Sequence, residues 1–397
     1  MKILLLDDES FTRRMVTHQL EQLGLSDVVG FEQPLDALAF LEAEGASVDI
    51  VLLDLQMPGM DGIEVLRHLA RQKFGGGVIL LSGEDRRIVG TALTLARAHN
   101  LNMLGALHKP VTPPELHALL STVAPVGRPL RRTGKTYTPD RVRQAIIDGE
   151  LVNYYQPKVD FTTGITAGVE TLVRWQHPED GLVFPDAFIG IAEAHGFIDD
   201  LTRAVLLVAI RQAHAWNAEG HVLHVGVNVS MDNLSSLDFP DFVASAAVSD
   251  GVPLRSLILE VTESRLMTNA LAALEILTRL RLKHIGLSID DFGTGHSSLA
   301  QLRDIPFDEL KVDKGFVHGA GKNLSNRAIL EASLGMARQL GMRTVAEGVE
   351  DRDDWDTLRA MHCDLAQGYF IAKPMPASAI PAWLIDWEPR RIALVRG

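Results

Sequence analysis

Two adjacent acidic residues in the C-terminal half of the sequence have the chemistry of a metal site. Asp290 and Asp291 follow a short apolar run and precede a glycine-containing turn, in Ser288-Ile289-Asp290-Asp291-Phe292-Gly293-Thr294-Gly295. This order predicts a buried strand that opens into a loop with two carboxylates at its tip. A strand end is rigid, and glycines let a ligand or a metal approach the backbone closely. An Asp-Asp pair before a turn is more often ordinary loop polarity, so the pair is informative only because other strand ends resemble it.

Several predicted strands in this half end in residues with oxygen ligands, and none of these ligands is a histidine or a cysteine. The set is Glu170, Asn228, Glu260, Asp290 and Asp291. Hard oxygen ligands suit Mg²⁺ or Mn²⁺ rather than zinc. Because one Mg²⁺ seldom takes so many ligands from protein, we expect two ions about 3.5–4 Å apart, bridged by a shared carboxylate, as in phosphodiester cleavage. One ion would activate water and the other would stabilise the leaving oxygen.

Two further residues, Lys311 and Glu347, would complete this chemistry. A lysine near the metals can orient water or offset phosphate charge, and Glu347 is placed to accept the proton of the attacking water. Taken singly, Lys311 would be a surface charge and Glu347 an acid at a helix start. Together with the ligand set, we predict that both residues are catalytic.

A second group of polar residues follows the predicted strands near the N-terminus. Its members are Asp7, Asp8, Asp54, Ser82 and Lys109. In an open parallel sheet these strand ends converge on one crevice. The three carboxylates of Asp7, Asp8 and Asp54 would bind one Mg²⁺ or Mn²⁺ there. We expect Asp54 to attack a phosphoryl group while the metal and Lys109 neutralise the transferring oxygens.

The elements that position these residues fall into two predicted domains, as expected for a chain of 397 residues. In residues 1–123, apolar runs at Ile3–Leu6, Asp49–Leu53 and Val78–Leu81 alternate with helix-spaced segments at Phe11–Leu23 and Pro34–Glu44. This alternation predicts a doubly wound α/β fold with five strand–helix units. Residues 124–137 are rich in proline, glycine and basic residues, and we interpret them as a solvated linker.

Residues 138–397 have the length of an eight-stranded α/β barrel, which typically has about 250 residues. Thr138-Pro139-Asp140 has the cap, proline and acid typical of a helix start, and Leu271–Leu282 and Ala328–Leu340 are two further predicted helices. The eight candidate strands are Val152–Val159, Ile165–Val173, Val222–Val229, Ser256–Val261, Ile285–Ile289, Glu309–Val312, Thr344–Ala346 and Asp364–Phe370. A barrel of this kind carries its chemistry at the carboxyl ends of its strands.

Composition restricts the function classes. The net charge of −13 argues against DNA or RNA as a partner, since phosphate backbones are met by clustered Lys and Arg. The single cysteine, Cys363, excludes an internal disulfide and fits a reducing compartment. No stretch approaches the roughly 20 apolar residues of a membrane span, and no targeting signal is visible. We therefore expect a soluble cytoplasmic protein.

The first predicted domain resembles the receiver domain of two-component response regulators. The resemblance implies that Asp54 is the phosphoacceptor, Asp7 and Asp8 the metal acids, Ser82 the switch hydroxyl and Lys109 the lysine of that family. It also implies a sensor histidine kinase or a phosphotransfer protein as partner. One departure is Ala106, which stands where the family usually has an aromatic residue three positions before the lysine, so the usual rotation of that ring cannot be the relay.

The second domain resembles the EAL-domain family of cyclic-di-GMP phosphodiesterases. The matching motifs, in chain order, are Tyr155-Gln156-Pro157, Glu170-Thr171-Leu172-Val173-Arg174-Trp175, Asn228-Val229-Ser230, Glu260-Val261-Thr262-Glu263, Asp290–Gly295, Lys311-Val312-Asp313, Glu347-Gly348-Val349-Glu350 and Gln367-Gly368-Tyr369-Phe370. Two positions depart from the pattern: Thr171 replaces the usual alanine and His296 the usual tyrosine.

The resemblance implies hydrolysis of cyclic-di-GMP to linear pGpG by two Mg²⁺ or Mn²⁺ ions, with the five oxygen ligands named above holding the metals. It gives Glu347 the role of base or second-metal ligand and Lys311 that of a water or phosphate partner. Glu263 would anchor the loop Asp291–Ser298, which in the family couples the active site to a dimer interface, so a homodimer or higher homo-oligomer is expected. The implied substrate contacts are Gln156, Arg174, Gln367 and Glu350.

Two other function classes stay open on the sequence. The barrel could bind cyclic-di-GMP without cleaving it and signal to a protein partner, or phosphorylated receiver domains could act as a scaffold. A receptor is free to lose metal ligands, whereas this chain keeps each one that the motifs place. Titration of cyclic-di-GMP with and without Mg²⁺, with a search for product, separates the three classes.

Overall fold

The computed structural model describes residues 1–44, 47–99, 101–121, 137–262, 270–293 and 305–396. The chain divides into two compact units, Met1–Gly134 and Lys135–Gly397, which are described separately below. Most of the predicted linker, 124–137, lies outside the described residues; its last residue, Tyr137, is buried against Trp175, with ring centroids 4.4 Å apart.

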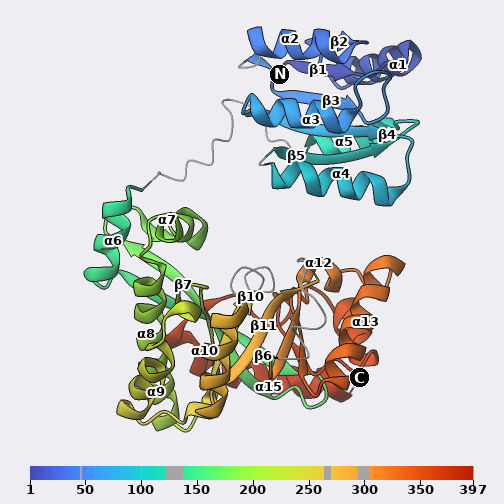
Figure 1. Ribbon diagram of the computed structural model, residues 1–397. Coiled ribbons are helices and arrows are strands. Elements are labelled where there is room, and N and C mark those ends of the chain that lie inside the picture. Colours follow the sequence, from blue (N-terminus) through green and yellow to red (C-terminus); the bar gives the residue numbers. More distant parts are fainter. Residues whose placement is uncertain (45–46, 100, 122–136, 263–269, 294–304, 397) are drawn as a thin grey trace. The chain divides into compact units, whose positions relative to one another are not determined.

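The first unit contains one five-stranded parallel sheet in the order β2-β1-β3-β4-β5 (Figure 1). Its strands are β1 Ile3–Leu6, β2 Val28–Phe31, β3 Ile50–Asp54, β4 Gly77–Ser82 and β5 Asn102–His108. Its helices are α1 Ser10–Gln22, α2 Pro34–Glu44, α3 Gly62–Arg71, α4 Arg86–Ala98 and α5 Pro113–Ser121. This confirms the predicted doubly wound fold and places the ends of β1, β3, β4 and β5 at one edge.

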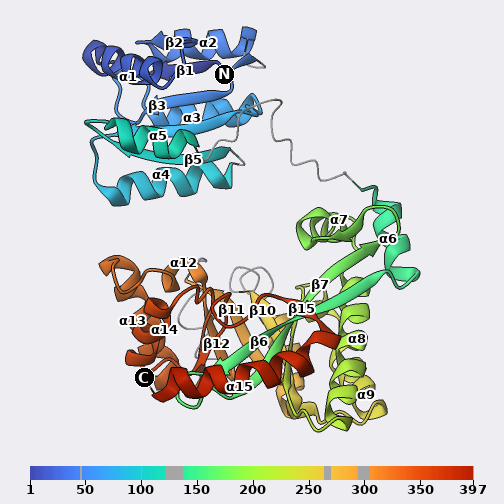
Figure 2. The ribbon, with the colours of Figure 1, turned by 180° about the vertical axis from the view of Figure 1, so that it is seen from behind.

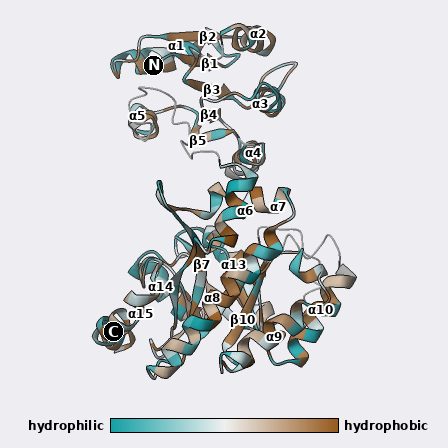
Figure 3. Ribbon diagram, turned by 90° about the vertical axis from the view of Figure 1, so that its left-hand side faces the viewer, coloured by the Kyte–Doolittle hydropathy of each residue, from teal (hydrophilic) through white to brown (hydrophobic). Residues whose placement is uncertain are grey.

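Both faces of this sheet are buried, because its strand side chains alternate between two hydrophobic cores. Leu4 and Leu6 of β1 pack with residues of α2, α3 and α4, whereas Ile3 and Leu5 pack with residues of α1 and α5. Strands buried on both faces are continuously apolar, and Figure 3 shows hydrophobic residues along β1 and β3. The apolar runs in the sequence therefore located these strands to within one residue.

The second unit is a closed barrel. Its strands form a sheet in the order β15-β6-β14-β13-β12-β11-β10-β9-β7-β8, and an additional pairing of β6 with β7 closes it. Because β8 and β15 pair only with β7 and β6, the closed ring has eight strands (Figure 1). The strands are β6 Leu151–Asp160, β7 Thr166–His177, β8 Gly181–Val183, β9 His224–Asn228, β10 Leu257–Thr262, β11 Gly286–Phe292, β12 Glu309–Val312, β13 Arg343–Ala346, β14 Leu365–Ala366 and β15 Met375–Pro376.

One strand of the ring runs against the others. β6 pairs antiparallel with both β7 and β14, whereas the remaining neighbours in the ring are parallel. The predicted TIM-like barrel is confirmed with this one reversal. The reversal means that successive residues of β6 descend into the barrel from the end where the other strands terminate, so Gln156 lies above Lys158 relative to that end.

Helices surround the barrel, and α15 runs across the strands on the side seen in Figure 2. The α-helices in the described part of this unit are α6 Pro139–Ile147, α7 Ile189–Ala194, α8 Ile198–Ala218, α9 Phe239–Ser249, α10 Ala270–Leu282, α12 Lys314–Val317, α13 Leu324–Gln339, α14 Arg352–Ala360 and α15 Ile380–Arg396. Short 3₁₀ turns are η2 Pro185–Ala187, η3 Asn233–Ser235, η4 Leu254–Ser256 and η6 Ala377–Ala379. The predicted start of α6 is confirmed, since the Thr138 side chain accepts a hydrogen bond from the Arg141 backbone N–H.

Two strand predictions need correction. The predicted strand Asp364–Phe370 ends at Ala366, because Gly368 lies against the backbone of Val349 and the chain turns away there. The predicted strand Ile165–Val173 corresponds to β7, which continues to His177 because its second half pairs with β6 and β8 in an extended hairpin. Glu170 therefore lies within this strand and not at its end.

Candidate functional site

The first candidate site lies at the carboxyl edge of the first unit's sheet. Lys109 follows β5, and its Nζ lies 2.8 Å from Asp54 Oδ2 and 2.9 Å from Asp7 Oδ2. Carboxylate oxygens of Asp7, Asp8 and Asp54 lie within 4.8 Å of one another, so the three could hold one cation. The Asp7 backbone carbonyl accepts a hydrogen bond from Arg13, at 2.6 Å, which connects the end of β1 to α1. The structure thus brings these predicted residues together.

Burial governs the charge of this pocket. It raises the pKa of Asp54 above its usual value, and the ammonium of Lys109 opposes that rise. Burial would lower the pKa of Lys109, but the hydrogen bonds and charges of Asp54 and Asp7 raise it. Ser82 ends β4 in the same edge, and its Oγ accepts a hydrogen bond from Glu84 N at 3.0 Å.

The position of Ala106 lies beside a hollow in the same unit. A cavity of about 650 Å³ extends from Ser82 along β5 between α4 and α5, with Val89, Leu93 and Leu119 among its lining residues. Ala106 lines this cavity, where a larger side chain would fill part of it. The expectation that Ala106 rules out the usual aromatic relay stays a prediction.

The second candidate site is built around Lys311, which is completely buried inside the barrel. Its Nζ lies 2.6 Å from Glu260 Oε2, 2.7 Å from Glu347 Oε1, 3.0 Å from Asp290 Oδ1 and 3.4 Å from Glu170 Oε2. These four acids come from strands β10, β11 and β7 and from the end of β13. One buried ammonium therefore faces four predicted site carboxylates.

The carboxylates form two groups that could hold cations. Glu170, Glu260 and Asp290 make one group, and Asp290, Asp291 and Glu347 make the other, each with ligand atoms within 4.8 Å of one another. Asp290 belongs to both groups. Asp291 has a positive φ of 54°, and its backbone N–H donates to Asp290 Oδ1 at 3.0 Å. The donor atoms are all oxygen, so the chemistry of the site fits Mg²⁺ or Mn²⁺.

Amide side chains orient Glu170. Asn228 Nδ2 donates to Glu170 Oε1 at 3.1 Å, and Gln367 Nε2 donates to Glu170 Oε2. The same Gln367 Nε2 lies 3.2 Å from Gln156 Oε1, and Gln156 donates to the carbonyl of Ala372 at 3.0 Å. The predicted residues Gln156, Asn228 and Gln367 therefore form one connected network on the rim of the carboxylate cluster.

The buried charges shift one another's ionisation in opposite directions. Burial would raise the pKa of Glu260, but the ammonium groups of Lys158 and Lys311 lower it to about 2. Burial raises the pKa of Glu347 to about 8, with Lys311 acting in the opposite direction. The carboxylates of Asp290, Glu170, Glu260 and Glu347 raise the pKa of Lys311 although burial opposes them. The pKa of Glu260 is thus lowered and that of Glu347 is raised, although both carboxylates contact Lys311.

An aromatic and cationic group lies next along β7. Arg174 is 8% exposed, and its guanidinium lies 5.0 Å from the centroid of the Phe184 ring and 5.6 Å from that of Tyr154. Phe184 itself is 59% exposed. Of these three residues, the sequence predicted only Arg174. Tyr154 and Phe184 gave no signal, because an aromatic residue in such a segment is as typical of a core position as of a binding site.

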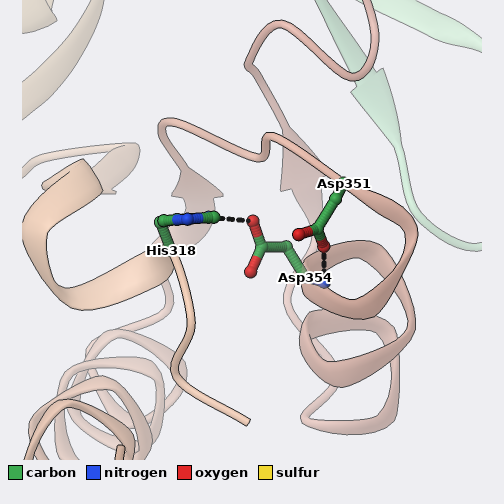
Figure 4. Close-up of side chains that lie close together, drawn as sticks. All are labelled: His318, Asp351 and Asp354. Carbon is green, nitrogen blue, oxygen red and sulfur yellow. Dashed lines mark hydrogen bonds and ion pairs between the residues drawn. The ribbon is translucent and has the colours of Figure 1, made fainter. Parts of the chain in front are cut away.

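The exposed predicted residue Glu350 lies at a second acidic cluster, which the sequence did not indicate. Figure 4 shows the His318 ring directed at the Asp354 carboxylate, with Nδ1 2.8 Å from Oδ2. The same carboxylate accepts hydrogen bonds from Gly319 N and Glu350 N, and Asp351 caps the start of α14 by accepting from Asp354 N. The hydrogen bonds of this cluster connect the loop after β13 to the segment after α12. Both carboxylate oxygens of Asp354 accept hydrogen bonds in this contact.

Two sequence predictions fall outside the described residues. Glu263, the predicted loop anchor, and His296 lie there, as does the loop Asp291–Ser298 beyond Gly293.

Sequence reasoning missed two charged residues inside the barrel, Lys158 and Glu309. Lys158 Nζ lies 2.9 Å from Glu260 Oε1 and 3.5 Å from Glu309 Oε2. Both residues stand in strands that were read as apolar runs. A signal was present, because Lys158 has the same inward parity as Gln156 two positions earlier.

With this geometry described, comparison with known proteins gives the family. The EAL domain model matches residues 140–374, which is more than half of the chain, and the response regulator receiver domain model matches residues 3–121. The chain belongs to the EAL-domain family and carries a receiver domain before the EAL barrel.

Individual relatives share this order of domains or the barrel alone. The chain is 31% identical to the cyclic di-GMP phosphodiesterase RocR of Pseudomonas aeruginosa over 95% of this chain and 96% of that protein. It is 41% identical to the cyclic di-GMP phosphodiesterase NbdA of the same species over 64% of this chain, but the match spans only 33% of NbdA. A solved PaMucR phosphodiesterase in complex with c-di-GMP has a TM-score of 0.58 at 39% identity and covers 61% of this chain and 98% of that one.

A search of the described helices for a membrane span found none of sufficient length and apolarity.

Proposed function

We propose that this chain hydrolyses cyclic-di-GMP to linear pGpG in the barrel, with two Mg²⁺ or Mn²⁺ ions held by Glu170, Asn228, Glu260, Asp290 and Asp291. The observation that carries the proposal is the sharing of Asp290 between two groups of carboxylates around Lys311. A shared carboxylate is the feature that two metals about 3.5–4 Å apart require. The similarity to RocR and to the PaMucR complex supports the substrate.

In this reaction a water oxygen forms a bond to one phosphorus, and the bond from that phosphorus to the ribose 3′-oxygen breaks. The bound cations would supply neutralisation of the phosphoryl oxygens and acidification of the water. Glu347 would take the proton of the water, since its carboxylate belongs to the second carboxylate group. Lys311 holds Glu347 at 2.7 Å and offsets the charge of the phosphoryl group. The 3′-oxygen leaves with a proton, which offsets the proton that Glu347 takes from the water.

The substrate would be oriented by the residues around the carboxylates. Arg174 can pair with a phosphate, and the exposed Phe184 ring beside it offers an apolar surface. Gln156 and Gln367 place amide groups at the rim of the cluster. Glu350 is exposed at the end of the loop that carries Glu347, so it is assigned to an outer contact with the substrate.

The receiver domain would regulate this reaction. A sensor histidine kinase or a phosphotransfer protein would donate phosphate to Asp54, with one Mg²⁺ or Mn²⁺ held by Asp8 and Asp54 beside Asp7. The new charge would lie within reach of Ser82 and Lys109. Since the family couples its active-site loop to a dimer interface, we assign a homodimer or higher homo-oligomer as the responding species.

Incubation of purified protein with cyclic-di-GMP and Mg²⁺, followed by chromatography, tests the function. The expected product is pGpG, and Ca²⁺ should inhibit because its looser coordination misplaces the attacking water. Binding of cyclic-di-GMP without product would instead favour the receptor, and full turnover in excess chelator would contradict the two-metal mechanism.

A further inference from the structure

Lys158 contacts Glu260, one of the proposed metal ligands, at a different carboxylate oxygen from the one that accepts from Lys311. Its side chain is 1% exposed, and its Nζ donates to Glu260 Oε1 at 2.9 Å. Lys311 Nζ donates to the other oxygen, Oε2, at 2.6 Å. The two oxygens of Glu260 therefore have different neighbours. Oε2 shares the Lys311 ammonium with Glu170 and Asp290, whereas Oε1 contacts Lys158, whose other ionic partner is Glu309.

The reversed strand β6 is what delivers Lys158 to this position. Because β6 runs antiparallel to its neighbours, its chain descends into the barrel after Gln156, which lies at the rim of the site. Alternate residues of a strand share one face, so Lys158 points into the barrel below Gln156. A parallel strand would have carried the chain out of the barrel at this end.

The surroundings of Lys158 keep its ammonium where it is. Glu309 Oε2 lies 3.5 Å from Lys158 Nζ, and Glu309 Oε1 is held in turn by Arg343 at 2.8 Å. Gly226 of β9 borders the contact, because a Cβ at this position would collide with Glu260 Oε1 and come within 3.3 Å of Lys158 Nζ. Arg343, Glu309, Lys158 and Glu260 thus form a row of charges of alternating sign. The absence of a side chain at Gly226 leaves space for the contact between Lys158 and Glu260.

From this arrangement we infer that Lys158 is a specificity-determining residue: it holds Glu260 Oε1, so that Glu260 offers a cation Oε2, the oxygen that contacts Lys311 on the side of Glu170 and Asp290. The inference rests on the proposed divalent-cation site. A carboxylate restricted to one oxygen suits Mg²⁺ and Mn²⁺, which demand near-octahedral coordination by single oxygens. Ca²⁺ accepts six to eight ligands and readily takes a carboxylate through both oxygens. Lys158 therefore disfavours Ca²⁺ relative to Mg²⁺.

Comparison of two divalent ions separates this effect from simple charge. Removal of the Lys158 ammonium changes the field for Ca²⁺ and Mg²⁺ alike, because both carry two positive charges. The ratio of their dissociation constants therefore reports on coordination geometry. The double variant Lys158→Met with Glu309→Gln removes one positive and one negative charge, so it also keeps the net charge of the barrel interior.

The experiment measures Ca²⁺ and Mg²⁺ binding to the full chain by calorimetry without substrate, in an Asp54→Asn background that weakens the receiver's own cation site. Wild type at position 158, Lys158→Met, the double variant and the exposed-lysine control Lys322→Met are compared. We expect the Ca²⁺/Mg²⁺ ratio of dissociation constants to fall about 10-fold in both Lys158 variants, in line with the effect of residues that orient metal ligands, and to stay unchanged in the control. Ca²⁺ should also inhibit turnover at correspondingly lower concentration.

An unchanged ratio in a folded double variant, as judged by circular dichroism and thermal melting, would overturn the inference. Should Lys158→Met alone fail to fold, the double variant decides the outcome. Absence of any divalent-ion binding to the barrel of the parent protein would instead contradict the proposed function, so the two failures are distinguishable.

Discussion

Replacement of Lys311 by methionine should destabilise the barrel strongly when no divalent cation is present. Its Nζ lies within 3.4 Å of oxygens from Glu170, Glu260, Asp290 and Glu347, and the side chain is fully buried. At an effective dielectric constant of about 20, each such contact is worth about 5 kcal/mol before solvation is counted. Desolvation of the buried ions offsets much of that sum, so we expect a net loss of about 3–5 kcal/mol, as when one partner of a buried ion pair is removed.

Divalent cations should reverse much of this loss. Mg²⁺ or Mn²⁺ brings two positive charges to the same carboxylates, and a ligand that binds only the folded state raises its stability. Lys311→Met should therefore gain more thermal stability from Mn²⁺ than wild type does, although its turnover should stay low because the proposed mechanism uses the Lys311 ammonium.

Scanning calorimetry of the full chain, with and without Mn²⁺, measures both effects. For a domain of this size a loss of 3–5 kcal/mol corresponds to a drop in melting temperature of roughly 6–20 °C. Lys322→Met is the matched control, because Lys322 pairs with Asp353 at 2.9 Å but is 82% exposed and exposed pairs contribute about 0–1 kcal/mol. A cation-free Lys311→Met protein that melts within a degree or two of this control would refute the electrostatic role assigned to Lys311.

Four further outcomes are expected. Glu347→Gln should keep cyclic-di-GMP binding and lose roughly 10²- to 10⁴-fold in turnover; a rate within a few-fold of wild type, measured under single-turnover conditions, would remove Glu347 from the mechanism. A small-molecule phosphodonor with Mg²⁺ should label wild type but not Asp54→Asn. Turnover of wild type alone should then change, at the low end of the roughly 5- to 150-fold range typical of allosteric coupling; an identical response of both proteins would exclude Asp54 as the switch. Thr171→Val should raise the free energy of unfolding by about 1 kcal/mol, because the buried Thr171 Oγ1 has no hydrogen-bond partner among the described residues and an unsatisfied hydroxyl is costly; urea denaturation showing a loss would mean that this hydroxyl is satisfied. His318→Gln should cost up to about 1 kcal/mol at pH 6 and nothing at pH 9: the hydrogen bond to Asp354 raises the His318 pKa, so the stabilisation is complete below the unfolded value and is lost as the pH rises through the folded one. An equal deficit at both pH values would show that the pair acts without its charge.

The sequence predicted the grouping of the receiver pocket because Asp7, Asp54 and Ser82 stand at the ends of apolar runs. Both faces of that sheet are covered, so the runs are continuous and their ends are sharp. Asp54 and Ser82 are the final residues of β3 and β4 in the structure, and Lys109 follows β5. In a parallel sheet, position along the chain then fixes position at the edge, and the contacts of Lys109 with Asp54 and Asp7 follow from it.

The barrel was harder to predict where the chain departs from a uniform parallel ring. The short connection between β6 and β7 was a sign of the reversal, because β6 ends at Asp160 and β7 begins at Thr166, whereas parallel neighbours need a crossover of a dozen or more residues. The pairing of β6 with β14, by contrast, joins segments distant along the chain and closes the ring. Glu170 lies within β7 rather than at its end for a related reason, namely the extension of β7 toward β8. The residue type at Glu170 predicted a metal ligand, whereas its place within the strand depends on the tertiary pairing of β7 with β6 and β8.

Buried charge explains why Lys158 and Glu309 escaped prediction although Lys311 did not. A single lysine in a strand is usually assigned to an edge or a surface, since burial of an unpaired ammonium is prohibitive. Burial becomes affordable only through Glu260 and Glu309, which lie 102 and 151 positions further along the chain and reach Lys158 through the closed ring. The interior of this barrel is therefore held by pairs of opposite charge as well as by apolar contacts. Such an interior has a functional consequence: a substitution that neutralises one interior charge alters the field at the carboxylate cluster even when it touches none of the proposed metal ligands, so cation binding and barrel stability should vary together across these positions.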